Sequence, residues 1–114
     1  MAGKYWFANN PSGRILAASA TVNFAAVTDG NEAAADVTVT GAALGDIVMA
    51  SFSLDLADMQ LSASVTAADT VSCVVSSSGD DVNLDSGTVR VLVIPSAAID
   101  DIAADLVGLT SADI

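Results

Sequence analysis

The sequence predicts an all-β fold: an antiparallel β-sandwich or barrel of six to seven short strands, with an extended N-terminal arm and one short C-terminal helix. The first observation is a period of two. Between residues 20 and 94, apolar residues recur at every second position in short runs, as in strands with one buried face. The second is that Gly, Asn, Asp and Ser interrupt these runs about every ten residues, a spacing typical of sandwiches and barrels. A chain of 114 residues fits one such domain.

The alternating runs define the expected core, which belongs to a β-domain over residues 15–95. In chain order, the inward-facing sets are expected to be Val22, Phe24 and Ala26; Val37 and Val39; Val48, Ala50, Phe52, Leu54 and Leu56; Leu61, Ala63 and Val65; Val71, Cys73 and Val75; and Val82 and Leu84. Turns or loops are expected at 29–31, 41–46, 67–69 and 76–80. Ser86-Gly87 predicts a tight turn into a last strand over 88–94.

The first 14 residues differ from the rest because they place Tyr5, Trp6 and Phe7 close to Lys4 and then break at 9–13. One interpretation is an arm, residues 1–14, that docks on a neighbouring molecule, where interfaces concentrate aromatic residues. The other is a first strand that closes the domain's own core. The sequence leaves both open.

After Pro95 the apolar period changes to that of a helix, expected over residues 96–108. Its apolar stripe is expected to comprise Ile99, Ile102, Ala103 and Leu106. Ser96 suits the N-cap and Gly108 the C-terminal stop. So short a helix is marginal alone in water, so its stripe must dock on its own domain or on a neighbouring subunit. Residues 109–114 are expected to form a mobile tail.

Charge and composition restrict the partners. The formal net charge is −11, with three basic residues, so we expect neither nucleic acid nor an anionic membrane as a partner. No run of about 18 apolar residues occurs that would span a membrane. Hydrophobic residues make up 53% of the chain but aromatic residues only 4%, which predicts a thin core of Ala and Val and favours additional burial between subunits.

The sequence offers little catalytic chemistry. It has no histidine and only one cysteine, Cys73, expected to be a small buried hydrophobe. We therefore expect no enzyme, no cofactor and no metal site. The alternation of Asp81, Asn83 and Asp85 is similar to the start of a calcium loop, but Gly87 comes one position late and Leu92 replaces the bidentate glutamate. A strand whose acidic side chains face water accounts for the same pattern.

Residues 35–94, about half of the chain, carry a family resemblance. The strings VTVTGAALGDIV from residue 37, VTAADTV from residue 65 and DSGTVRV from residue 85 resemble a β-module that recurs in structural proteins of tailed bacteriophages. These proteins include capsid decoration (cement) proteins and head or tail fibres. The resemblance implies a virion protein on the outer capsid surface, a homo-oligomer expected to be a trimer, that bridges neighbouring major capsid proteins.

This interpretation assigns expected contacts. The capsid contact is expected to involve Tyr5, Trp6, Phe7 and Arg14, and the packing between subunits Ile99, Ile102 and Leu106. The alternative is a fibre or appendage module that binds a host-surface carbohydrate or receptor. The small size favours the capsid, because a fibre needs additional shaft or receptor-binding segments.

Overall fold

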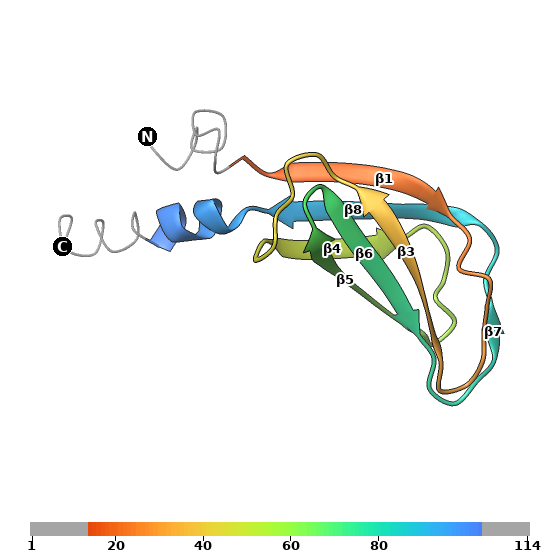
Figure 1. The fold of residues 1–114 in the computed structure, drawn as a ribbon. Coiled ribbons are helices and arrows are strands. Elements are labelled where there is room, and N and C mark those ends of the chain that lie inside the picture. Colours follow the sequence, from red (N-terminus) through yellow and green to blue (C-terminus); the bar gives the residue numbers. More distant parts are fainter. Residues whose placement is uncertain (1–13, 104–114) are drawn as a thin grey trace.

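The structure is a computed structural model that describes residues 14–103 (Figure 1). Its regular secondary structure is mostly β, as the sequence predicts. The strands are β1 (Leu16–Val22), β2 (Ala26–Val27), β3 (Glu32–Thr38), β4 (Ile47–Phe52), β5 (Gln60–Ala67), β6 (Thr70–Ser76), β7 (Val82–Asn83) and β8 (Gly87–Ile94). A helix begins at Ser96 and is described to residue 103.

The strands form two three-stranded antiparallel sheets, in the orders β1-β8-β4 and β3-β6-β5, and a short pair of β2 with β7. The two larger sheets pack as a sandwich (Figure 1). At its two open sides β4 lies beside β5, and β1 lies beside β3. The start of β1 pairs with the end of β8, so β1 and the helix extend from the same end of the sandwich.

The core is built mainly from valine, whose branched side chain suits a strand with one buried face. Val71, Cys73, Val75, Val89 and Val93 are completely enclosed. These residues come from β6 and β8, the central strands of the two sheets. The expected inward face of β6 is therefore confirmed, including the burial of Cys73.

Two predicted strand faces end earlier than expected. Ala26 is exposed and Val27 is buried, because Ala25 adopts a left-handed backbone conformation, with φ +61°, that breaks the alternation after Phe24. The strand predicted to continue to Leu56 stops at Phe52, and Leu54 is 40% exposed rather than inside. The residues after Phe52 form a loop to β5.

Ser86-Gly87 is not the predicted tight turn. β7 pairs with β2, whereas β8 pairs with β1 and β4, so no hairpin joins β7 to β8. Gly87 is the first residue of β8, and a Cβ atom there would lie only 2.7 Å from Cζ of Phe52. The glycine allows the Phe52 ring to lie against the backbone, which is a known use of glycine within a strand.

The start of the helix differs from the prediction. The carbonyl of Pro95 accepts hydrogen bonds from the N–H groups of Ala98 (2.9 Å) and Ile99 (3.3 Å), so Pro95 rather than Ser96 occupies the N-cap. The N–H of Ser96 donates to Oδ1 of Asp46 at 2.9 Å. A carboxylate from the connection between β3 and β4 thus satisfies a helix donor that has no partner within the helix.

The buried side of the helix is also rotated from the predicted stripe. Ala98 is completely buried and Ile102 is half-buried, whereas Ile99 is 37% exposed and Ala103 is exposed. Ala98 and Ile102 are four residues apart and lie on one helix face. Residues 104–108 of the expected helix lie outside the described residues.

Candidate interaction surfaces

The outer face of the β1-β8-β4 sheet carries no acidic residue. Directly opposed residues of antiparallel strands share a face, and those opposite the buried valines of β8 point inward. The remaining, outward-facing residues are Ala17, Ser19 and Thr21 of β1, Thr88, Arg90, Leu92 and Ile94 of β8, and Ile47, Met49 and Ser51 of β4. This surface, called here the acid-free face, belongs to a chain with 14 acidic residues.

The apolar part of the acid-free face is continuous across the strands. Ala17, Leu92 and Met49 lie in register, and Ile94 lies opposite Ile47 in the next row. Met49 is 60% exposed and Ile47 is 46% exposed. A group of exposed apolar side chains on a protein surface marks a site of interaction more often than isolated ones do.

A positive charge adjoins this apolar strip. Arg90 lies in register with Ser19 and Ser51, one row beyond Leu92, and its side chain is exposed. Arg90 is one of three basic residues in the chain. A partner that presents apolar groups beside a carboxylate would therefore meet complementary chemistry here.

The outer face of the other sheet has a different character. Its residues are Glu32, Ala34, Asp36 and Thr38 of β3, Thr70, Ser72, Val74 and Ser76 of β6, and Gln60, Ser62 and Ser64 of β5. Hydroxyl groups and two carboxylates dominate this surface, so it suits contact with water. Of the two sheet faces, only the acid-free face can be approached without meeting a carboxylate on the sheet itself.

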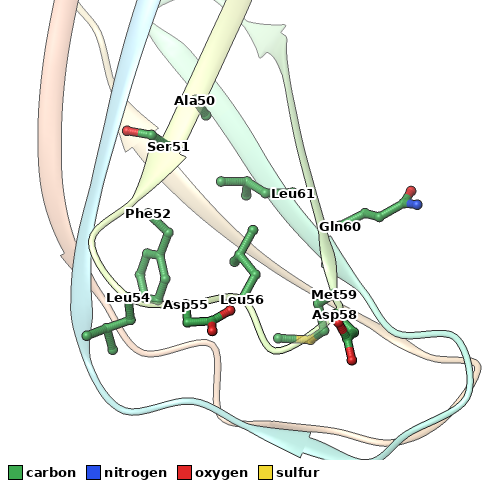
Figure 2. A pocket seen from close by; sticks show the side chains of 10 residues that line it. All are labelled: Ala50, Ser51, Phe52, Leu54, Asp55, Leu56, Asp58, Met59, Gln60 and Leu61. Atoms are coloured by element: carbon green, nitrogen blue, oxygen red, sulfur yellow. The ribbon is translucent and has the colours of Figure 1, made fainter.

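A second surface feature is an open groove between β4 and β5, with a volume of about 730 Å³. It is lined by Ala50, Ser51, Phe52, Leu54, Asp55, Leu56, Asp58, Met59, Gln60 and Leu61. Figure 2 shows Phe52, Leu56 and Leu61 pointing into the space between the two strands, while Gln60 points away. The groove therefore has an apolar floor, and the exposed carboxylates of Asp55 and Asp58 lie at its rim.

A tight turn shapes the floor of the groove. The N–H of Met59 donates to the carbonyl of Leu56 at 3.0 Å, and the two residues between them, Ala57 and Asp58, have φ of +52° and +72°. The N–H of Ala57 donates to Oδ1 of Asp55 at 2.9 Å. The left-handed conformation costs a non-glycine residue about 1–2 kcal/mol, so the turn holds Leu56 and Met59 in place at the expense of local strain.

Replacing Ala57 with glycine is therefore expected to stabilise the protein by about 0.5–1 kcal/mol. The substitution removes the steric cost of the left-handed backbone, which exceeds the additional entropy that glycine loses on folding. Urea denaturation would measure the change. Ala34→Gly, at an exposed position within β3, is the matched control and should destabilise by a similar amount. Destabilisation by Ala57→Gly would contradict the assigned strain.

The residues predicted to make contacts are distributed as follows. Tyr5, Trp6, Phe7 and Leu106 lie outside the described residues, and Arg14 is exposed ahead of β1. Ile99 is exposed and Ile102 is half-buried. Their roles in capsid and subunit contact remain predictions, because the structure holds a single chain.

Two further features of the sequence are the single thiol, Cys73, and the string similar to a calcium loop, Asp81, Asn83 and Asp85. Burial raises the pKa of the Cys73 thiol, and the nearby carboxylate of Asp36 raises it further. Asp81, Asn83 and Asp85 are exposed while Val82 and Leu84 are half-buried, so the predicted alternation is confirmed. Within residues 14–103, no three His, Cys, Asp or Glu side chains are grouped so that they could hold a metal ion.

Hydrogen bonds join the 28–31 turn to the 77–81 loop, and in each bond a carboxylate of one segment accepts from a backbone N–H of the other. Oδ1 of Asp81 accepts a hydrogen bond from the N–H of Asp29 at 2.8 Å, and Oδ1 of Asp29 accepts one from the N–H of Gly79 at 2.6 Å. Asp81 therefore joins two loops that are far apart in the sequence.

The sequence pattern predicts neither surface. Met49, Leu92 and Ala17 become neighbours only through the order β1-β8-β4, which the alternation of apolar residues does not predict. In the part of the chain that the structure describes, no helix is both long and apolar enough to cross a membrane. No family model, curated protein or solved structure matches this chain.

Proposed function

We propose that this chain is a non-enzymatic structural protein of a bacteriophage virion that decorates and stabilises the outside of the capsid as an oligomer, with a trimer as the expected state. The observation that carries the proposal is the acid-free face, an apolar strip beside Arg90 on a protein of net charge −11. The phage assignment itself comes from the sequence resemblance over residues 35–94.

The distribution of acidic residues indicates which side of the protein would contact the capsid. Acidic groups at the turns, on the outer β3-β6-β5 face and along the helix keep a protein soluble and discourage nonspecific association. On a decoration protein they would point to the solvent, while the acid-free face would rest on the major capsid protein. An acidic exterior also suits the outside of a DNA-filled shell better than its lumen.

The size of the face supports an oligomer. Eight residues along β8 and three strands across give a flat area of about 400 Å², about half of what one partner contributes to an interface of standard size. One copy would therefore bind weakly. Several linked copies that engage neighbouring capsid sites together gain affinity through effective concentration.

Co-sedimentation with capsids of the parent phage, assembled without this chain, tests the proposal after a solution mass measurement has fixed the oligomer state. Met49→Glu places a carboxylate in the apolar strip and should weaken binding about tenfold, because that charge would lose its water at the interface. The matched control is Ser64→Glu, which adds the same charge to an exposed position on the opposite sheet and should leave binding unchanged.

Equal binding by Met49→Glu and the wild-type protein would refute the docking role of the acid-free face. Binding to host-surface glycans without any binding to capsids would place the chain with fibre or appendage modules instead.

A further inference from the structure

We infer that the groove between β4 and β5 binds residues 1–13 of a second copy as an added strand, so that exchanged arms connect the oligomer. The inference concerns contacts between copies of this chain. It can therefore be tested on the purified protein without any capsid.

The groove lies between two free strand edges. β4 pairs only with β8, and β5 pairs only with β6, so each ends its sheet in the part of the chain that is described. A free edge presents backbone N–H and C=O groups that an extended segment can pair with. In this mode of recognition the main chain supplies hydrogen bonds, while alternate side chains enter pockets beside the edge.

The groove offers the matching pocket. Phe52, Leu56 and Leu61 form an apolar floor between the strands (Figure 2). The open groove, with a volume of about 730 Å³, has room for a large aromatic side chain. The strained turn at Ala57 and Asp58 holds Leu56 in the floor in advance, and such strain is commonly found at binding sites.

The first 13 residues have the chemistry that this groove selects. They contain the chain's only Trp and Tyr, Trp6 and Tyr5, followed by Phe7. Lys4 is their one charged residue, in a chain that otherwise has only two cations. In an extended segment Lys4 and Trp6 point to the same side, and Trp6 would enter the apolar floor. Lys4 would then lie near the carboxylates of Asp55 and Asp58 at the rim.

The position of the start of β1 favours an arm from a second copy over the chain's own arm. β1 begins where Leu16 lies opposite Val93, whereas the groove adjoins Phe52, at the other end of the sheet. β1 and β4 are also at opposite edges of that sheet (Figure 1). A chain's own arm would have to reverse, cross about 10 Å of sheet and return about 20 Å along it. The arm of another copy can enter directly, as in domain swapping.

Sedimentation equilibrium of full-length variants tests the inference. Trp6→Ala should weaken association at least about thirtyfold, because a buried aromatic anchor is lost. The double substitution Asp55→Asn with Asp58→Asn should weaken it about two- to tenfold. Asparagine can keep both the hydrogen bond to Ala57 and the left-handed backbone at Asp58.

The matched control is Asp36→Asn with Asp85→Asn, which removes two exposed carboxylates away from the groove. Because this change lowers repulsion between acidic copies, association should stay equal or become tighter. If association weakens in the groove variant but not in the control, the loss comes from contacts in the groove rather than from the change in net charge. Circular dichroism would establish that every variant is folded.

Disulfide trapping identifies the donor of the arm. When a tagged Phe7→Cys copy is mixed with a Leu54→Cys copy and oxidised, a covalent dimer of the two should form, since Leu54 lines the groove and is exposed whereas Cys73 is buried. The exchange would be overturned if the protein were a monomer in which Trp6 is shielded from solvent, and if a single chain that carries both Phe7→Cys and Leu54→Cys formed an internal disulfide.

The inference would also be overturned by an oligomer in which Trp6 is exposed and Trp6→Ala leaves association unchanged. If that variant then lost capsid binding, the arm would contact the capsid, as the sequence resemblance implies. The Met49→Glu experiment has a different readout, so capsid docking by the acid-free face and arm exchange can fail separately.

Discussion

Replacing Phe24 with alanine is expected to lower the free energy of unfolding by about 3–5 kcal/mol. Phe24 is only 4% exposed, and its ring packs edge-on against Phe52, with centroids 5.4 Å apart and an interplanar angle of 64°. The substitution removes the buried ring, the aromatic contact and the support for Phe52, and leaves a cavity. Urea denaturation followed by far-ultraviolet circular dichroism would measure the loss.

The loss should be large because the surrounding core consists mainly of valine, whose short side chains cannot extend into the cavity. Domains of this kind are stable by about 5–15 kcal/mol in total, so Phe24→Ala is expected to come close to unfolding the protein. Phe24→Leu keeps most of the volume and should cost less than about 1.5 kcal/mol. A loss below about 1 kcal/mol for Phe24→Ala would show that Phe24 does not anchor the core.

Phe24 also shows what the sequence can and cannot reveal about this fold. Alternation placed Val22 and Phe24 inside, and both are buried. It failed at Ala26, because Ala25 has a left-handed backbone and alanine gives no signal for that conformation. The strand expected to reach Leu56 ends at Phe52, and its alternation does not mark that end. The tight turn at Ala57 and Asp58 is also poorly marked, since its first left-handed position holds alanine rather than the usual glycine or asparagine.

The candidate surfaces depend on contacts between distant parts of the chain. The acid-free face requires β1 and β4 to flank β8, and periodicity assigns faces to strands without assigning neighbours. The groove arises where β4 stops and the loop to β5 begins, which is where the predicted strand was too long. Ser96 had a suitable residue type for an N-cap, but Pro95 takes that place and Asp46 binds the N–H of Ser96. Each of these features is set by tertiary structure.

Replacing Gly87 with alanine is expected to destabilise the protein by about 2–3 kcal/mol, through overpacking. The added methyl group would lie 2.7 Å from Cζ of Phe52 and 2.9 Å from Oγ of Ser53. Neither neighbour can move freely. The Phe52 ring is held by Phe24, and Ser53 is bound to Thr88 through two hydrogen bonds, from its own N–H to the Thr88 carbonyl and from the Thr88 N–H to its hydroxyl.

A double-mutant cycle with Phe52→Leu would identify the cause, because leucine lacks the ring atoms nearest to the added methyl group. In that background Gly87→Ala should cost less than about 1 kcal/mol, which gives a coupling between the two positions of at least about 1 kcal/mol. Glycine is also costly in a strand for entropic reasons, and alanine stabilises a protein where it fits without strain. Stabilisation by Gly87→Ala, or equal costs in both backgrounds, would therefore show that Gly87 is not retained to accommodate Phe52.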